Sequence, residues 1–228
     1  ISDSHEWHLW GEGEGSFTIS LPVILWTKTG FHSFMSSRFH HDDQGLIVVE
    51  SKGARFVRSH GKIYQLNDAE KQSEFNSDHE ITNAIQPLDL SITKNVASML
   101  LSVIVLLLLF GLAGSSSKKN QGAPKGLASF LEPLVVFVRD DIVKPNVGEG
   151  YKKYLPYLLT LFFFILINNL LGLLPGAANV TGNIAITLVL SFITLIVTNL
   201  SGNKSYWSHI FKPPGVPLAL MPIMIPIE

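Results

Sequence analysis

The longest apolar stretch of the chain, residues 155–203, reads LPYLLTLFFFILINNLLGLLPGAANVTGNIAITLVLSFITLIVTNLSGN and contains no Asp, Glu, Lys or Arg. It is more than twice as long as the roughly 20 residues that a helix needs to cross a bilayer. Pro175-Gly176 and Gly182 interrupt it, so we expect two spans, at about 155–174 and 183–200, joined by a short uncharged turn. This stretch predicts a protein that crosses a membrane more than once.

A second uncharged stretch, residues 95–117, precedes it. We expect a span at about 91–113 that faces lipid nearly all round, because its second half lacks a polar face. Over the whole chain only 15% of residues are charged, against about 25% in an average soluble protein. The sequence therefore predicts an all-α, multi-span membrane region over residues 91–228.

Two further apolar segments accompany the spans. Residues 127–143 place apolar side chains at helical spacing, at Leu127, Leu131, Leu134, Val138 and Ile142. We expect an amphipathic helix that lies in the interface or on a partner helix, with a solvated linker helix as the alternative. Residues 216–228 predict the start of a fourth membrane helix that stops at Glu228. Because the chain also begins without Met, we expect a processed or truncated product.

The polar N-terminal residues 1–90 differ from the rest in pattern. Phe17, Ile19 and Leu21 alternate with polar residues, and extended stretches follow at 45–50 and 54–66. His60-Gly61 is typical of a hairpin turn, and a helical run is expected near Asp78. The sequence predicts a small β-rich or irregular extension before the membrane region.

Basic residues set the expected orientation. The segment 114–153 holds seven Lys and Arg residues, whereas the turn 175–182 holds none. Cytoplasmic loops carry the excess of Lys and Arg. We therefore expect an N-terminus outside the cytoplasm.

Composition excludes several functions. A net charge of −1 and a pI near 6.8 leave no electrostatic footprint for nucleic acid. The absence of cysteine excludes disulfides and thiol chemistry. No nucleotide-binding or nucleophile motif is present, so we expect neither an enzyme active site nor a cofactor. Two histidine-containing stretches, 5–8 and 40–43, lack a helical spacing and a clear third ligand, so we expect no metal site.

Polar residues inside the spans are the strongest candidates for function. Asn183, Thr187, Ser191, Thr194 and Thr198 share one helix face. They either pack against another helix or line a hydrated path. Asn168 and Asn169 form an amide pair that favours helix packing, and Glu228 is either a proton-handling carboxyl or a solvent-facing terminal residue.

Three motifs in order, LINNLLGLLP at 166–175, VTGNIAIT at 180–187 and PGVPLAL at 214–220 with Glu228 after them, resemble subunit a of the rotary F-type ATP synthase. The resemblance extends over residues 88–228 and includes the loop 131–141. The extension is similar to the version found in some bacteria.

The resemblance implies a non-catalytic stator in the bacterial plasma membrane, beside a ring of c subunits and the peripheral-stalk subunit b. Asn169 and Asn183 match positions that line the extracytoplasmic access path, and Glu228 matches a carboxylate of the cytoplasmic exit. Together with Thr187 they are the expected proton path. Some relatives carry aspartates at Gly172 and Asn183. The family's essential arginine lies on a helix that continues past Glu228, so the resemblance implies that this chain stops before it.

Two alternatives remain at this stage. An unrelated ion or solute transporter would predict an inverted repeat, and no convincing repeat is present in the sequence. A binding protein with its site in the His-rich extension would use the spans only as an anchor.

Overall fold

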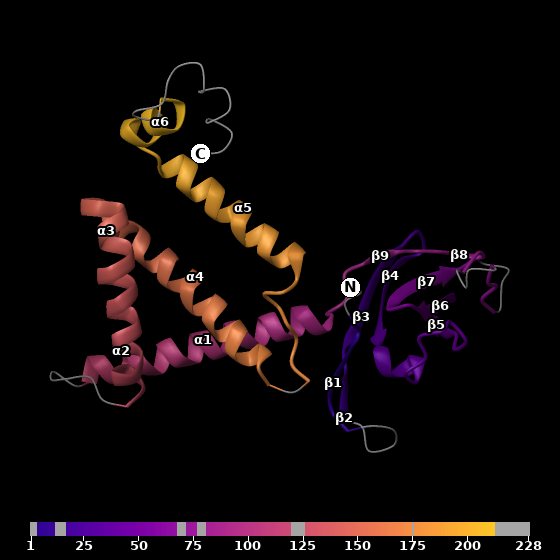
Figure 1. Cartoon of the computed structure of the whole chain (residues 1–228). Coiled ribbons are helices and arrows are strands. Elements are labelled where there is room, and N and C mark those ends of the chain that lie inside the picture. The colour runs from indigo at the N-terminus through magenta and orange to yellow at the C-terminus, as the bar shows by residue number, and fades with distance from the viewer. Residues whose placement is uncertain are drawn as a thin grey trace. The chain divides into compact units, whose positions relative to one another are not determined.

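The computed structural model describes residues 4–11, 17–67, 72–76, 81–119, 126–174 and 176–212. The chain forms two compact units, Ile1–Val180 and Thr181–Glu228, and each is described by itself. In the first unit, strands precede a bundle of helices (Figure 1). The second unit contains two helices among its described residues.

The extension is β-rich, as predicted. Its strands pair antiparallel in three small sheets. The sheets have the orders β1-β2, β4-β3-β9 and β5-β6-β7-β8. The strands are β1 (Glu6–Trp10), β2 (Phe17–Ser20), β3 (Pro22–Thr27), β4 (Gly30–Met35), β5 (Val49–Ser51), β6 (Ala54–Ser59), β7 (Lys62–Leu66), β8 (Ala84–Ile85) and β9 (Leu88–Asp89), with a 3-10 helix at Ser36–Phe39.

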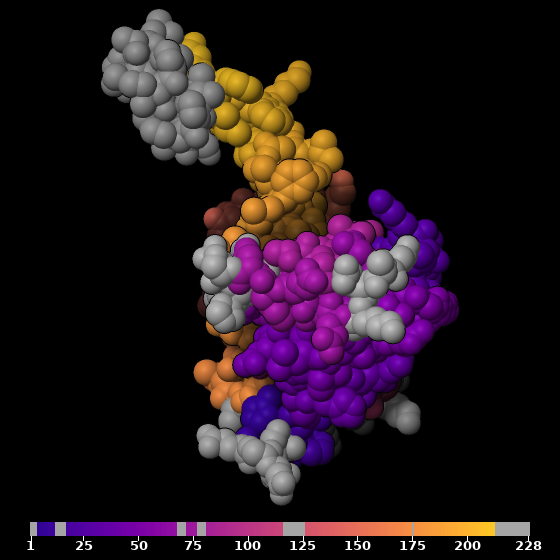
Figure 2. Space-filling view, turned by 90° about the vertical axis from the view of Figure 1, so that its right-hand side faces the viewer, coloured from indigo at the N-terminus to yellow at the C-terminus, as the bar shows by residue number. Residues whose placement is uncertain are grey.

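Alternating side chains build the core of the extension. In β3, Val23 and Leu25 are fully buried while Trp26, the residue after Leu25, is exposed, as the period of two along a strand requires. They pack with Phe34, Phe56 and further apolar side chains of both larger sheets. Figure 2 shows the extension, in indigo and purple, as a continuous packed surface.

The predicted turn at His60-Gly61 is confirmed. It joins β6 to β7, with Ser59 paired to Lys62. Both turn residues have positive φ, 49° at His60 and 74° at Gly61, as a two-residue type I′ hairpin requires.

Two local predictions in the extension were wrong. The stretch 45–50 becomes a strand only at Val49, because the Asp42 carboxylate accepts the backbone N–H groups of Leu46 and Ile47 at 2.7 and 2.8 Å and holds them in a loop. The helical run expected near Asp78 is also absent from residues 81–93, which form β8, β9 and connecting segments; residues 77–80 lie outside the described part.

Helix α1 (Lys94–Lys119) begins directly after the β-rich extension. The predicted start near residue 91 is three residues early, because Ser91 is still bonded to the sheet. Its N–H donates to Asp89 Oδ1 at 2.9 Å, and its Oγ accepts from the N–H of Ile24 at 2.9 Å. The Lys94 N–H then donates to the carbonyl of Ser4, which ties the helix start to the N-terminal strand.

Among the residues that the structure describes, three helical runs are long and apolar enough to cross a membrane: Lys94–Ser115, a crossing within Leu127–Gly172, and Ile184–Ser201. The second contains α4 (Tyr151–Gly172), and the third is α5. These helices and the β-rich extension confirm the predicted fold class. A short amphipathic helix, α6 (Lys204–Phe211), follows α5 and was not predicted. The expected membrane segment 216–228 lies outside the described residues.

The amphipathic segment departs from a uniform helix. It consists of α2 (Leu127–Phe137), a π-helix (Val138–Val143), α3 (Lys144–Val147) and a 3-10 turn (Gly148–Gly150). Leu131 and Val138 are buried as the spacing predicts, but Ile142 is 40% exposed and Val143 is buried instead. A π-helix bonds residue i to i+5. The residue one turn after Val138 on the same face is therefore Val143, five positions further along, and not Ile142, four positions further along.

Helices α1, α2 and α4 share one apolar core. Ala113, Ala128, Leu131 and Phe163 are its buried members. The rings of Phe110 on α1 and Phe163 on α4 meet edge to face at 4.8 Å, a favoured aromatic geometry. This core holds the first two crossing helices together.

Candidate functional site

The two asparagines at the end of α4, Asn168 and Asn169, lie in different environments. Asn168 is 1% exposed. Its Nδ2 donates to Ser102 Oγ on α1 at 3.0 Å and to the carbonyl of Phe164 at 2.8 Å. An amide that bonds a serine of the neighbouring helix joins the two helices, as small polar residues do in membranes. The prediction of helix packing is confirmed for Asn168.

The partner of Asn168 was missed from the sequence. Ser98 and Ser102 are almost fully buried and lie four residues apart on α1. This spacing puts both on one face, and small side chains there allow a close approach of α4. Two serines one turn apart in an apolar span were the available signal.

One atom of this contact lacks a hydrogen bond. Among the described residues, Asn168 Oδ1 has no partner although it is buried. A buried carbonyl oxygen without a partner is costly in an apolar region. It marks a position that a water molecule or a polar group of a further helix would satisfy.

Asn169 lies on the exposed side of α4, next to Asn168 in sequence but on another face. It is a polar side chain in the last turn of a membrane-crossing helix. Gly172, three residues on, is also exposed, so both residues lie on the surface of α4 outside the α1 contact.

Asn183 and Thr187 meet at the start of α5 (Ile184–Ser201). Asn183 is the N-cap residue, and its Oδ1 accepts the N–H of Ala185 at 2.9 Å. The Thr187 hydroxyl donates to the carbonyl of Asn183 at 3.2 Å and to that of Ile184 at 3.1 Å. Capping satisfies an N–H group at the helix start that otherwise lacks a partner.

The other stripe residues continue this pattern along α5. The Thr194 hydroxyl donates to the carbonyl of Leu190 at 2.9 Å, a local bond common in membrane helices. Ser191 and Thr198 are exposed in this unit. The stripe is therefore locally bonded at Thr187 and Thr194 and open at Ser191 and Thr198.

The four predicted proton-path residues fall in three places. Asn169 belongs to the first unit, and Asn183 and Thr187 lie in contact in the second. Glu228 lies outside the described residues. The uncharged stretches 95–117 and 155–203 supply no Asp, Glu, His, Lys or Arg, so polar groups within them are limited to amides, hydroxyls and backbone.

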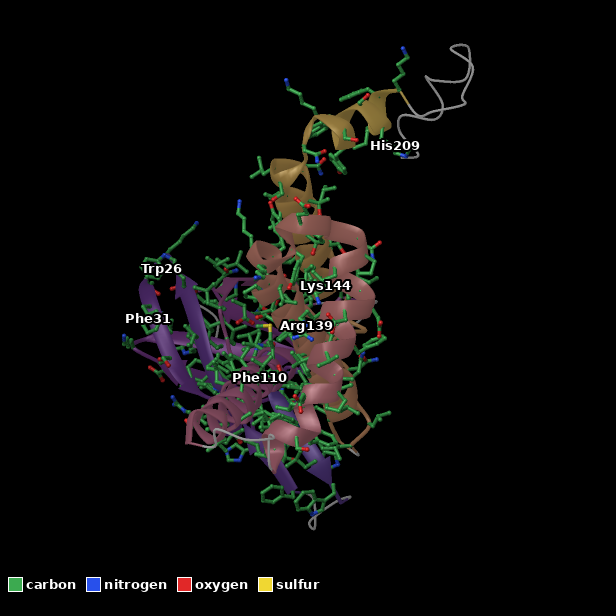
Figure 3. The ribbon with its side chains drawn as sticks, turned by 90° about the vertical axis from the view of Figure 1, so that its left-hand side faces the viewer. Trp26, Phe31, Phe110, Arg139, Lys144 and His209 are labelled. Atoms are coloured by element: carbon green, nitrogen blue, oxygen red, sulfur yellow. The ribbon has the colours of Figure 1, made fainter. Side chains whose placement is uncertain are left out.

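Charged residues cluster instead on the segment between α2 and α4. Arg139 donates to both carboxylate oxygens of Asp140, from Nε at 3.0 Å and from NH2 at 2.7 Å, and Lys144 pairs with the same carboxylate. Hydrogen bonds from Arg139 and then from Lys144 hold the pKa of Asp140 well below its ordinary range. Figure 3 labels Arg139 and Lys144 on this helical segment.

The His-containing stretches of the extension serve the fold. His5 Nε2 lies 2.8 Å from Asp89 Oδ2, and His41 Nδ1 lies 2.8 Å from Glu6 Oε2. Asp43 faces Arg58, and Asp42 closes a loop. Within the described ranges, no three His, Cys, Asp or Glu side chains come together in a group suited to a metal ion.

Two protein families match the chain in complementary parts. Residues 96–228 match the family described as ATP synthase A chain. Residues 1–90 match a domain of unknown function, DUF8433.

Curated relatives match a little over three fifths of the chain. The chain is 50% identical over 148 residues to "ATP synthase subunit a 2" of Chlorobaculum tepidum, covering 61% of this chain and 41% of the relative. It is 50% identical over 147 residues to "ATP synthase subunit a" of Chlorobium phaeobacteroides, covering 61% and 43%. For the Myxococcus xanthus "ATP synthase subunit a", the values are 40% over 148 residues, 62% and 48%. The aligned part therefore spans less than half of each of these relatives. No solved structure matches the chain at a significant level.

Proposed function

Because this chain belongs to the ATP synthase A chain family, we propose that it supplies part of the stator proton channel of a rotary F-type ATP synthase. The observation that carries the proposal is the family match over residues 96–228, which takes in nearly all of the three runs able to cross a membrane. In this proposal the chain is a non-catalytic subunit that works beside a c-ring and the peripheral-stalk subunit b.

We assign the proton path to Asn169, Asn183, Thr187 and Glu228. Amides and hydroxyls do not release protons at physiological pH, but they bind and orient water molecules, and a hydrogen-bonded chain of water relays protons. Asn183 and Thr187 lie on adjacent turns at the start of α5, where they would border a hydrated access path. Glu228 is the titratable member of the set, and its role is to exchange protons at the opposite exit.

The proposed orientation follows from the basic residues. Arg139 and Lys144 lie between α2 and α4, and Lys152 and Lys153 lie in the first turn of α4. An excess of Lys and Arg marks the cytoplasmic side. In this proposal α2 and the π-helix lie on the cytoplasmic face of a bacterial plasma membrane and the β-rich extension lies outside it.

The test is ATP-driven proton pumping in inverted vesicles that carry the complete protein in its complex. We expect Glu228→Gln and Thr187→Val to slow pumping. Glu132→Gln, an exposed carboxylate on α2, is the matched control and should pump at the normal rate. Full pumping and coupling in Glu228→Gln would remove that residue from the path.

A second measurement tests the partners. The complete protein, purified from its native membrane in mild detergent, should bring a c oligomer with it. Purification of an intact protein that is consistently free of c subunits would overturn the stator proposal.

A further inference from the structure

An apolar groove lies where the β1–β2 hairpin meets α1 and the residues that follow α4. Its volume is about 760 Å³, within the range of ligand sites in proteins. One wall comes from the hairpin through Trp7, Leu9 and Trp10, and another from α1 through Leu100, Leu101 and Ile104. We call it the hairpin groove.

The hairpin is held in place at the groove. Trp7 Nε1 donates to the carbonyl of Gly176 at 2.9 Å. Gly176 has φ +76°, and a Cβ built on it would lie 2.2 Å from the Leu9 carbonyl oxygen. The hairpin backbone therefore approaches the segment after α4 as closely as a glycine allows, which fixes the spacing of the groove walls.

The groove surface is open and apolar. Leu101 and Ile104 are 40% and 54% exposed, and Trp10 is 62% exposed. None of the described residues that line the groove is charged, and Ser98 is the polar side chain among them besides the indole N–H groups. Such a surface favours an apolar occupant, because it offers few partners to polar groups.

The groove continues the lipid-facing surface of the protein. Leu100, Leu101 and Ile104 lie inside the crossing run Lys94–Ser115. Beside them the rings of Trp10 and Phe17 stack at 4.8 Å and are both exposed. Tryptophan and other amphipathic aromatics collect where hydrocarbon meets water. The hairpin thus has the composition of an element at a membrane interface.

We propose that the hairpin groove holds an acyl chain of a bilayer phospholipid, with the β1–β2 hairpin lying in the membrane interface. A chain in the adjacent leaflet reaches the groove along α1 without crossing a polar surface. A protein segment fits less well, because its backbone N–H and C=O groups would find few partners there. The proposal rests on the crossing helices and not on the proton path.

The experiment uses a phosphatidylcholine with a photoreactive diazirine at the end of one acyl chain, in vesicles that contain the complete protein. After illumination, labelled peptides are mapped. We expect label on residues 7–10 of β1 as well as on 100–104 of α1. Absence of label on the hairpin would overturn the proposal.

Variants that fill the groove, or that make its wall polar, distinguish an acyl chain bound in the groove from nonspecific lipid contact with the hairpin. Ala97→Leu with Ala177→Leu fills it, and should lower hairpin labelling about tenfold, as expected when about two buried CH₂ groups are excluded. Leu100→Gln, at an exposed wall position, should lower it as well without disturbing packing. Ala185→Leu, exposed on α5, is the matched control and should leave hairpin labelling unchanged.

Two results would contradict the inference. The first is hairpin labelling that survives both groove variants, since the label would then come from the outer surface of the hairpin. The second is a bifunctional protein cross-linker that joins Trp7-region peptides to a second protein chain while the lipid label is absent. Either would assign the groove to another occupant or to none.

Discussion

Asn168 on α4 donates its Nδ2 hydrogen to Ser102 Oγ on α1 over 3.0 Å, and both side chains are buried between the first two crossing helices. This hydrogen bond joins the two helices alongside their apolar contacts. It also places the neighbouring Asn169 on the exposed side of α4, where the proposed proton path needs it.

The Asn168–Ser102 bond can be measured directly. In a double-mutant cycle of Asn168→Ala and Ser102→Ala, we expect a coupling free energy of about 0.6 kcal/mol and no more than ~1.7 kcal/mol, as found for hydrogen bonds between membrane helices. The free energy of unfolding in mixed micelles is the readout. Pairing Asn169→Ala with Ser102→Ala is the control, and coupling there of equal size would contradict the assignment.

Gly176 should resist substitution more than other glycines with a positive φ. Gly176→Ala combines a positive φ with a contact to Leu9, whereas Gly148, with φ +74°, has open space where its Cβ would be. A side chain in the left-handed region costs about 1–2 kcal/mol, so Gly148→Ala should lose about that much stability. We expect Gly176→Ala to lose clearly more and to shift the fluorescence of Trp7. Equal losses would show that the hairpin does not depend on this contact.

The carboxylate of Asp89 gives the extension a pH-dependent stability. Burial raises its pKa, but hydrogen bonds from His5 and Ser91 outweigh burial, so the pKa of Asp89 lies below its ordinary value. A carboxyl with a lowered folded-state pKa stabilises the protein above its unfolded pKa, and this contribution is lost as pH falls through the folded value. The native protein should therefore exceed Asp89→Asn in stability at pH 7.

The same reasoning predicts how the stability difference between the native protein and Asp89→Asn changes with pH. It should shrink as pH falls below about 4, near the unfolded pKa of an aspartate. Unfolding curves of both proteins at several pH values check this, with exposed Asp141→Asn as the control that should track the native protein throughout. A difference independent of pH would contradict an ionised Asp89.

Arg58 joins the first hairpin to the four-stranded sheet. It is 5% exposed, and it pairs with Glu6 at 2.9 Å and with Asp43 at 3.4 Å. Removing one partner of a buried ion pair leaves an uncompensated charge and costs about 3–5 kcal/mol. We expect Arg58→Ala to unfold the extension at 37 °C, as seen in circular dichroism of the β signal. Exposed Lys62→Ala should leave it folded, and a stable Arg58→Ala protein would show that the pair is dispensable.

Several features followed from residue patterns alone. Alternation of apolar residues indicated strands such as β3, and His60-Gly61 indicated the hairpin that forms there. Long uncharged stretches indicated the crossing helices. These patterns are local, because each one arises within a single helix or hairpin.

Other features depend on tertiary packing, which local sequence patterns do not reveal. The partner of Asn168 lies 66 residues away at Ser102, and the exposed Ile142 changes place with the buried Val143 because of a π-helix. The hairpin groove joins residues of β1, α1 and the segment after α4. Pairings over such sequence distances depend on how elements dock.

By itself the sequence determined that this chain enters a membrane, because uncharged runs of such length are stable in hydrocarbon only as helices with their backbone bonds satisfied internally. It also determined that no carboxylate or base lies within those runs. Tertiary structure decided that the Asn168 amide is bonded between helices and that the Asn169 amide is exposed. It also formed an apolar groove beside the β1–β2 hairpin of the extension. Those outcomes depend on the distances between side chains that only docking of the elements brings together.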